Sequence, residues 1–489
     1  MSPNPSRKPH DTIVRLPRAS ELEVRTIQEP PLRRPRRIFT PQFIVVYGFT
    51  GLIVLGTLLL LLPFSDSQGR STSLLLALFT ATSAVTVTGH TAASTTEHWS
   101  YFGQAVIFLL MLVGGLGFMA GATFILELIG RQRTSIAHQL VLLETMGEDH
   151  RNLGGLVRTI RNVVILAFTF YAIGTLFFLP RIQEITGFGF IESLWQSAFL
   201  SVSSFNNAGF SILPEVADSR SLAILDNQWI MQSVMVLLIM LGSIGYSVME
   251  DIWRKRRPVR FSLDTKLVLI GSVLLWGIGF LTYFLAGFIA VGGQDSIGFG
   301  HQAGTAIFHS VSGRTAGFII ADFGAAEDFI KLVFTFLMLI GGASASVTGG
   351  IKINTFMVLF VAVVSFIRTR QQAEAFGREI PQTHVFRAVA VAALAMVFIV
   401  VTVPILTITE ADALRAGDMQ FLDLFFDTVS AFATNGSSTG IVPQLGTLGQ
   451  LIFVAAMFVG RLGPLTLALT LAPESKTLYR YAQEPVKIG

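Results

Sequence analysis

Four related stretches of the sequence decide its fold: Thr86-Val-Thr-Gly89, Asn206-Asn-Ala-Gly209, Arg314-Thr-Ala-Gly317 and Ala433-Thr-Asn-Gly436. Their glycines are separated by 120, 108 and 119 residues, which suits two membrane helices joined by a hairpin. Each motif follows a segment of apolar and hydroxyl residues that is too short to cross a bilayer and fits a re-entrant helix. These segments are residues 74–85, 193–205, 301–313 and 421–432. The pattern predicts four fused membrane–pore–membrane repeats.

The composition places these repeats in a membrane. Of the 489 residues, 52% are apolar and only 13% are charged, which is more hydrophobic surface than a soluble core needs. A membrane helix needs about 20 largely apolar residues. Uncharged stretches of roughly this length are Phe43–Leu62, Gln104–Leu126, Val163–Leu179, Ile230–Val248, Leu267–Val291 and Ala388–Ile408. We therefore expect an all-α integral membrane protein with its repeats arranged around a central pore.

The charges predict the topology. Arginine and lysine gather in three loops between spans, within residues 131–161, 254–260 and 368–378. Cytoplasmic loops carry an excess of these residues, so we expect these loops and both termini in the cytoplasm of a multi-pass cell-membrane protein. Residues 1–41 are polar and rich in Pro and Arg, which predicts a disordered basic tail. The four repeats would then be residues 42–130, 131–253, 254–370 and 371–489.

The four motifs have the features of a cation filter. Backbone carbonyls can replace the water that an ion loses in a narrow pore if several segments present them around one axis. Glycine permits the positive φ angles that such a backbone needs, and each preceding helix would direct its negative end at the ion. The expected filter residues are Val87, Thr88, Gly89, Asn207, Ala208, Gly209, Thr315, Ala316, Gly317, Thr434, Asn435 and Gly436. The alternative is that the glycines only allow helices to pack closely.

A serine also recurs before each motif. It precedes the glycine by six residues in three repeats and by five in the third; these serines are Ser83, Ser203, Ser430 and Ser312. The third repeat is therefore expected to be one residue tighter.

Six markers follow one another along the chain: residues 83–89, 205–210, 314–318, 341–343, 349–352 and 460–466. With these markers the sequence resembles the Trk/Ktr/HKT superfamily of potassium transporters, and most closely its KtrB-type subunits, from Pro41 to the C-terminus. It departs from the family pattern at His90, where a leucine-like residue is usual, and at Ala345 and Val347, where glycine and threonine are usual.

The resemblance implies eight transmembrane helices, four pore hairpins and a homodimer with one pore per subunit. It also implies potassium selectivity, because glycine at all four filter positions goes with potassium in this family. K⁺ would be the substrate, and Na⁺ is an open candidate for a coupling or activating ion. Gating would come from a cytoplasmic nucleotide-binding ring subunit of the KtrA type. Nucleotide would then act only through that partner, and this chain would hold no cofactor.

Small residues interrupt the second span of the third repeat. They have low helix propensity in mid-membrane, and a glycine-flanked loop below a filter can lie across an ion path and move aside. In the resembling family this loop is the gate. The expected gate residues are Gly341, Gly342, Ala343, Ser344, Ala345, Ser346, Val347, Thr348, Gly349, Gly350 and Lys352. The alternatives are a packing kink for the loop and an interfacial anchor for Lys352.

Two arginines lie in segments expected within the membrane. Arg461 is near the middle of the last span, where a charge needs polar surroundings. The resemblance implies that Arg461 is a pore barrier below the filter and contacts the gate loop, whereas an ion pair with Asp427 is the alternative. Arg314 lies within the third motif, where its charge would repel cations, so we expect it to brace the filter.

Two other functions stay open on the sequence alone. A sodium-coupled or less selective monovalent cation carrier could use the same helices, although parallel repeats favour a pore. A membrane scaffold or receptor would leave the four glycines and Arg461 unexplained.

Enzyme chemistry is not expected, because the chain has no cysteine, no Walker A or HExxH motif, and no metal-ligand spacing among its eight histidines. A net charge of +4 does not predict nucleic-acid binding, and membrane lipid is the expected surrounding partner.

Overall fold

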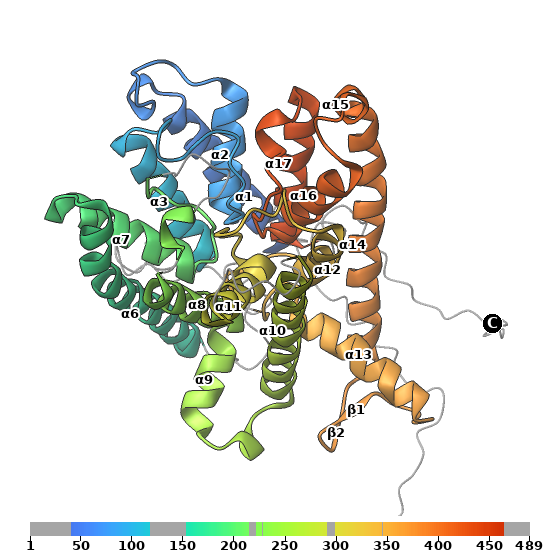
Figure 1. Cartoon of the computed structure of the whole chain (residues 1–489). Helices are drawn as coiled ribbons and strands as arrows, with labels where there is room; N and C mark the ends of the chain where they lie inside the picture. Colours follow the sequence, from blue (N-terminus) through green and yellow to red (C-terminus); the bar gives the residue numbers. More distant parts are fainter. Residues whose placement is uncertain are drawn as a thin grey trace, which may run out of the picture. The chain divides into compact units, whose positions relative to one another are not determined.

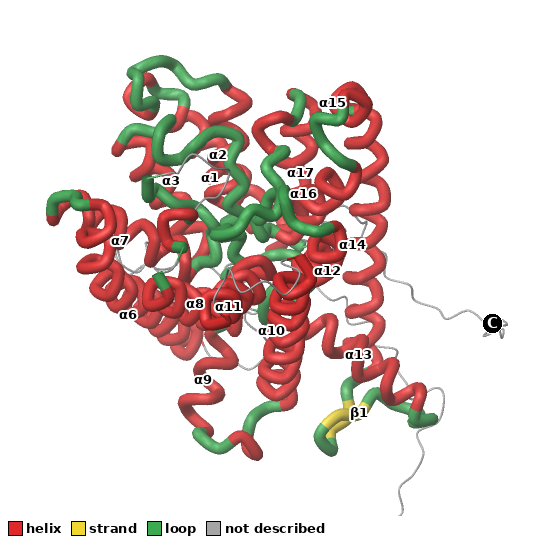
Figure 2. The backbone as a smooth tube through the Cα atoms, viewed as in Figure 1, coloured by secondary structure: helices red, strands yellow, loops and turns green. Residues whose placement is uncertain are grey.

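The computed structural model describes residues 41–117, 153–214, 222–226, 228–290, 299–344 and 346–463. These residues all fall in the unit that begins at Pro41. Helices make up most of this part of the chain, as Figure 2 shows, and its only strands form a short antiparallel hairpin. The all-helical fold class predicted from composition is therefore confirmed. The basic tail predicted for residues 1–41 lies outside the described residues, apart from Pro41.

The described helices follow one another in a recurring order (Figure 1): a long helix, a short helix that ends at one of the four motifs, and another apolar helix. These groups are α1 (Pro41–Leu60), α2 (Leu74–Thr86) and α3 (Tyr101–Leu116); α6 (Leu153–Thr186), α7 (Phe190–Phe205) and α8 (Trp229–Ile244); α10 (Leu263–Ala290), α11 (Phe299–Thr315) and α12 (Asp328–Leu339); and α14 (Gln382–Thr409), α16 (Phe421–Ala433) and α17 (Thr447–Leu462). The remaining elements are α9 (Tyr246–Lys255), α13 (Ile353–Ile367), α15 (Ala411–Ala416), β1 (Glu374–Ala375), β2 (Arg378–Glu379), and the 3-10 turns η3 (Pro63–Ser65), η4 (Ala223–Leu225), η5 (Pro258–Arg260) and η6 (Val442–Gln444).

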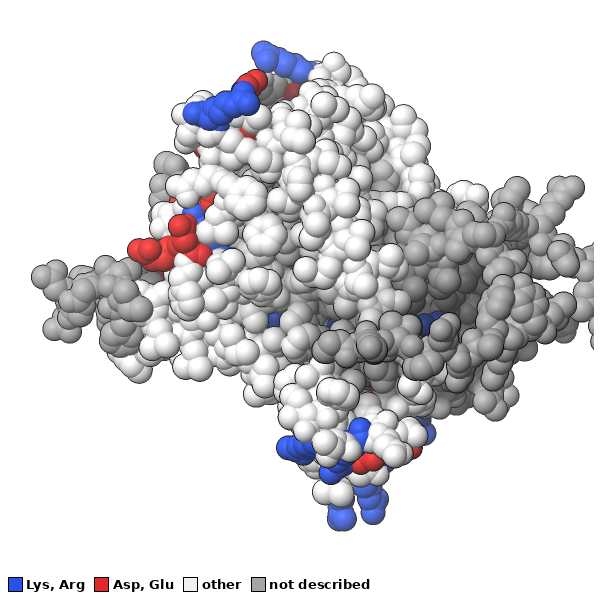
Figure 3. Space-filling model, turned by 90° about the vertical axis from the view of Figure 1, so that its right-hand side faces the viewer, with Lys and Arg blue, Asp and Glu red and all other residues white. Residues whose placement is uncertain are grey.

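Helix length and surface chemistry suit a bilayer. Three described stretches are long and apolar enough to cross it: Arg161–Thr186 in α6, Leu263–Ala286 in α10, and Gln382–Thr409 in α14. Their outward side chains are apolar, for example Leu176, Val273 and Val400, which are 69%, 67% and 63% exposed. In Figure 3 the charged side chains lie mainly near the rim of the described surface, and its middle is mostly uncharged. Lipid, rather than water, is the solvent that matches such a surface.

The four helix groups contact one another in a closed cycle. Within each group the short helix packs on its neighbours: α2 on α1 and α3, α7 on α6 and α8, α11 on α10 and α12, and α16 on α14 and α17. Between groups the second apolar helix packs on the next short helix: α3 on α7, α8 on α11, α12 on α16, and α17 on α2. The last contact joins the end of the described chain to its beginning. The short helices are therefore neighbours in space although they are far apart in sequence.

A glycine permits close contact between the second helix and the end of the short helix in three groups. A Cβ atom added to Gly114, Gly242 or Gly460 would lie 2.0, 1.9 or 1.7 Å from a carbonyl oxygen of the short helix in the same group. The three carbonyls belong to Val85, Phe205 and Phe432. Those distances are far below van der Waals contact, so no larger residue fits without moving backbone. The helices can approach this closely only because glycine has no side chain.

One predicted span is bent and is not a single straight helix. The stretch Ile230–Val248 does not form one helix, because α8 ends at Ile244 and α9 begins at Tyr246 with a bend of 93° between them. Gly245 makes the bend possible with a φ of +84°, an angle that glycine adopts without steric cost. Its Cα faces the loop after α12, and a Cβ there would lie 3.0 Å from the carbonyl oxygen of Ser344. The span breaks where this distant loop occupies the space.

A buried ion pair joins the third and fourth groups. Lys331 of α12 lies 2.8 Å from Asp423 of α16, and the two side chains are 4% and 12% exposed. Lys331→Met alone should lower the free energy of unfolding by about 3–5 kcal/mol, because it leaves a buried carboxylate without its partner. Thermal unfolding of the detergent-purified protein, followed by tryptophan fluorescence, measures the loss.

Removing both charges provides the control for this prediction. The double variant Lys331→Met/Asp423→Asn should regain most of the lost stability, since no unpaired charge is left in the interior. Arg415→Met breaks an exposed pair with Asp412, in which Arg415 is 80% exposed, and should change stability little. A double variant as unstable as Lys331→Met would contradict this account of the pair.

Candidate ion pathway

The four motifs form turns at the C-terminal ends of the short helices. The helices α2, α7, α11 and α16 end at Thr86, Phe205, Thr315 and Ala433. The motif glycines have φ angles of 89°, 72°, 72° and 91° at Gly89, Gly209, Gly317 and Gly436. Only glycine adopts such angles readily, so the shared residue follows from the shared backbone conformation. The negative end of each short helix is directed into its own turn.

The four turns lie next to one another. A Cβ added to each glycine would meet a carbonyl oxygen of the next motif: Ala208 at 2.3 Å from Gly89, Ala316 at 2.7 Å from Gly209, Asn435 at 2.3 Å from Gly317, and Thr88 at 1.9 Å from Gly436. The fourth contact returns to the first motif. The predicted filter segments are thus brought together in a closed cycle of backbone contacts. Close helix packing, the alternative role for these glycines, does not require such a cycle.

The recurring serine holds each turn. Its carbonyl oxygen accepts a hydrogen bond from the backbone N–H five residues later, at 2.8–3.0 Å, and the four donors are Thr88, Ala208, Gly317 and Asn435. In the third motif the donor is the glycine itself, which makes this turn one residue tighter, as the serine spacing predicts. The hydroxyl groups of Ser83 and Ser430 also accept hydrogen bonds from the N–H groups of Gly89 and Gly436, both at 3.1 Å.

Side chains around the turns are buried and connect neighbouring motifs. Asn207 and Thr315 are joined by a hydrogen bond of 2.9 Å, and the Asn435 amide donates to the carbonyl oxygen of Gly313 at 3.2 Å. Val87, Ala316 and the other nonglycine residues predicted for the filter are at most 4% exposed. None of the four motifs contains a carboxylate. Within the motifs themselves, the groups that can attract a cation are uncharged oxygens, backbone carbonyls among them, and the ends of the short helices.

A nonhelical loop connects α12 and α13 beneath the turns. Ile340 and Ile351 pair as a parallel bridge, which closes residues 341–350 into a loop, of which residue 345 is not described. Within the loop, the N–H of Gly342 donates to the Thr348 hydroxyl at 2.8 Å. A Cβ on Gly349 would lie 2.1 Å from the hydroxyl oxygen of Thr434. The interruption predicted from the small residues is present, and it lies directly against the fourth motif.

The loop is also bound to the helices around it. The N–H of Ala343 donates to the carbonyl oxygen of Ser243 on α8 at 2.8 Å, and the N–H of Gly350 donates to that of Gly460 on α17 at 3.3 Å. The ammonium group of Lys352 donates to the carbonyl oxygen of Thr348. Lys352 therefore holds the end of the loop and is also the N-cap residue of α13.

Arg461 of α17 connects the loop to α3. One terminal nitrogen of its guanidinium group donates to the carbonyl oxygen of Val347 in the loop, and the other to that of Gly114 on α3 at 2.5 Å. The alternative pairing with Asp427 is wrong for the described residues. Asp427 instead accepts hydrogen bonds from the Ser438 hydroxyl at 2.6 Å and from the N–H of Thr439 at 2.9 Å. The carboxylate thus holds the segment after the fourth motif.

Comparison with known proteins decides the family. The model of the TrkH family, described as a cation transport protein, matches residues 28–480. This chain belongs to the TrkH family. Ktr system potassium uptake protein B of Bacillus subtilis is 33% identical to this TrkH-family chain over 451 residues, which cover 92% of this chain and 97% of the relative. Potassium/sodium uptake protein NtpJ of Enterococcus hirae is 32% identical and covers 94% of this chain and 99% of the relative. The resemblance to potassium transporters of the Trk and Ktr type is confirmed.

A solved structure shares the fold of this TrkH-family chain. The potassium transporter TrkH from Vibrio parahaemolyticus superposes with a TM-score of 0.66 at 18% identity, covering 91% of this chain and 86% of that one. The relatives and this neighbour are named as uptake or transport proteins. A membrane transporter is thus the class to which the TrkH-family chain belongs.

The partners of Arg314 were not evident from the sequence of this TrkH-family protein. Its Nε atom donates to the carbonyl oxygen of Ile340 at 3.1 Å, and Nη2 donates to that of Gly341 at 2.8 Å. Arg314 is 1% exposed and its guanidinium group lies 5.7 Å from the ring centre of Trp276. Arg314 therefore connects the third motif to the start of the loop. These contacts reach beyond the four motifs, whereas the sequence suggested only a brace for the filter.

Proposed function

We propose that this TrkH-family chain takes up potassium ions across the cytoplasmic membrane through a filter of backbone carbonyls. The observation that carries the proposal is the closed cycle of contacts among Gly89, Gly209, Gly317 and Gly436. A dehydrated ion at the centre of such a cycle would exchange water for carbonyl oxygens. The four helix ends around it would each add a partial negative charge. Potassium as the substrate is supported by the names of the relatives.

The same proposal accounts for the architecture. The four helix groups would be membrane–pore–membrane repeats, with eight transmembrane helices and four pore hairpins around one axis. The termini would lie in the cytoplasm with the basic segments 254–260 and 368–378, as the positive-inside bias predicts. The turns after α2, α7, α11 and α16 would then face the outer side.

Residues 341–350 are proposed as the gate. Its contacts with the fourth motif, α8 and α17 support this role, because a loop held there would close the proposed path below the filter. Lys352 and Arg461 would hold its closed position through the carbonyl oxygens of Thr348 and Val347. The charge of Arg461 would also oppose the passage of cations, which makes it the proposed pore barrier.

The names of the relatives support a system of more than one component, because they are called Ktr system proteins. Within such a system we propose a homodimer of this chain and a cytoplasmic nucleotide-binding subunit of the KtrA type. Nucleotide would act on that subunit, and this chain would hold no cofactor. The relative named as a potassium/sodium uptake protein supports a second candidate, a sodium-coupled or less selective cation carrier.

Tracer uptake tests the proposal. Proteoliposomes containing the purified chain should accumulate a rubidium tracer, and external potassium should suppress this uptake far more than sodium does. Equal competition by the two ions would favour the less selective carrier. No uptake by well-folded protein, either alone or with its nucleotide-binding partner, would contradict a potassium pathway.

A further inference from the structure

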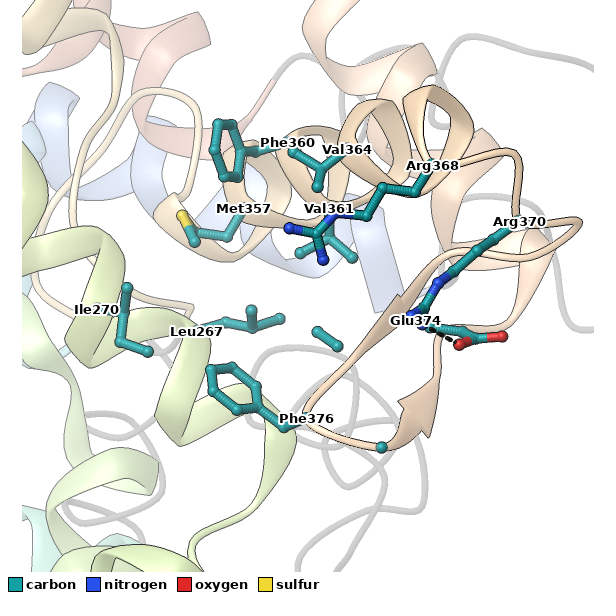
Figure 4. Close-up of a pocket in the computed structure, with 12 residues that line it drawn as sticks. Leu267, Ile270, Met357, Phe360, Val361, Val364, Arg368, Arg370, Glu374 and Phe376 are labelled. Carbon is teal, nitrogen blue, oxygen red and sulfur yellow. Dashed lines mark hydrogen bonds and ion pairs between the residues drawn. The ribbon is translucent and has the colours of Figure 1, made fainter.

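An apolar pocket lies between α10, α13 and the β1–β2 hairpin (Figure 4). Its volume is about 410 Å³, within the size range of ligand sites. The wall is formed by side chains of α10 and α13: Leu267, Ile270, Met357, Phe360, Val361 and Val364. Phe376 of the hairpin covers its other side. None of these residues belongs to the motifs or to the loop that form the proposed ion pathway.

Two arginines stand at the mouth of this pocket and differ in their partners. Arg370 is paired with Glu374 at 2.5 Å. Arg368 has no ion pair within the described part of the chain, and in Figure 4 its guanidinium group reaches back over the apolar wall. An unpaired arginine at this position can bind an oxyanion, and phosphate is a group that its planar donors match well.

The pocket lies where apolar helices give way to charged segments. Leu267 and Ile270 are in the first two turns of the span Leu263–Ala286 of α10, and Arg368 directly follows the last residue of α13. The wall residues Ile270 and Phe360 are 46% and 49% exposed. A membrane protein leaves such residues open to hydrocarbon, and basic side chains beside them sit at headgroup level. A ligand with a hydrocarbon chain in the pocket and a phosphate at its mouth has the chemistry of a phospholipid.

We propose that this pocket binds one anionic phospholipid, with an acyl chain against α10 and α13 and its phosphate on Arg368. A lipid in this position would contact α13, which continues the chain directly from the 341–350 loop. The binding itself requires only that the protein lies in a membrane. It does not depend on which ion the protein carries. The proposed topology, with residues 368–378 in the cytoplasm, would place this lipid in the cytoplasmic leaflet.

Native mass spectrometry of the full chain in detergent tests the lipid site. Phosphatidylglycerol and phosphatidylcholine with the same acyl chains are added separately, and glycerol phosphate serves as a headgroup without chains. We expect one phosphatidylglycerol per chain to be retained in preference to phosphatidylcholine, and no retention of glycerol phosphate. Arg368→Gln should weaken phosphatidylglycerol binding about fivefold, the effect of one interfacial basic residue. Val364→Trp, which fills the pocket, should weaken it at least as much.

Arg254→Gln is the matched control, because Arg254 is a basic residue of α9 with a 71% exposed side chain outside the pocket. It should bind phosphatidylglycerol as the parent does. Unchanged binding in both pocket variants, or an equal loss in Arg254→Gln, would overturn the proposal. Retention of glycerol phosphate would also overturn it, because that result indicates a site for a free anion. A loss of dimers in both pocket variants would do the same, because it indicates a contact between two copies of the chain. Rubidium uptake by proteoliposomes made from the same variants reports separately on the ion pathway.

Discussion

Gly89→Ser should remove most of the discrimination between potassium and sodium. Gly89 has a φ of +89°, and a Cβ there would lie 2.3 Å from the carbonyl oxygen of Ala208 and 2.9 Å from Cα of Gly209. Backbone of the first or the second motif must therefore move, which changes the distance between at least one carbonyl and the ion. If that carbonyl contributes about 1.5–3 kcal/mol, as interactions with charged groups commonly do, selectivity falls about tenfold or more. Competition of sodium and potassium with rubidium uptake measures the change.

Gly187→Ser separates this effect from simple backbone strain. Gly187 also has a positive φ, of +70°, but a Cβ there would meet nothing within 4 Å. The control variant should therefore lose a little stability and keep its selectivity. Potassium discrimination that persists in folded Gly89→Ser protein would argue against the filter. An equal loss in Gly187→Ser would show that the effect does not come from the cycle of turns.

The sequence predicts the turns well because their requirements are local. A glycine that needs a positive φ, a serine five or six residues before it, and a helix too short to span are all visible within one segment of about 20 residues. The same holds for the interruption at 341–350, where small residues cannot support a helix in mid-membrane. Backbone conformation at these sites is decided by neighbours in the chain, and a pattern that recurs four times identifies it.

The cyclic order of the groups depends on contacts that no single segment encodes. Gly114, Gly242 and Gly460 look like ordinary helix-packing residues, and only the structure shows each against the carbonyl at the end of a short helix. The bend at Gly245 has the same origin, since the loop around Ser344 lies more than 90 residues away in the sequence. A hydropathy profile assigns residues 230–248 to one span because it depends on local sequence alone. It contains no information about the distant loop that packs against Gly245.

Two arginines connect the loop to the rest of the pathway from opposite ends. Arg314 binds the carbonyl oxygens of Ile340 and Gly341, where the loop begins, and Arg461 binds that of Val347 near its middle. Neither has a carboxylate partner in the described part of the molecule. Each guanidinium group instead donates to main-chain carbonyls that a helix would have used internally, although Nη1 of Arg314 has no hydrogen-bond partner in the described part of the chain. The interruption of the helix and the burial of these arginines therefore stabilise one another.

Shortening the loop by residues 344–348 should raise basal rubidium uptake. The deletion removes the carbonyl oxygen of Val347, which Arg461 binds, and the hydroxyl of Thr348, which accepts the N–H of Gly342 at 2.8 Å. A hydrogen bond to a charged group contributes about 1.5–3 kcal/mol, so its loss would shift a closed–open equilibrium about tenfold to a hundredfold toward the open state. Uptake into proteoliposomes without the partner subunit measures the change. Potassium selectivity should persist, because the four motifs are intact.

Arg461→Lys and Arg461→Gln distinguish a tether from a charge barrier. Lysine keeps the charge, but its single ammonium group lacks the planar pair of donors that reaches both Val347 and Gly114. If Arg461 acts mainly by tethering the loop, both variants should raise uptake toward the level of the shortened loop. If charge alone opposes cations, only Arg461→Gln should do so. Unchanged or lower uptake in the folded deletion variant would contradict the gate, since a loop that blocks nothing can be removed without opening a path.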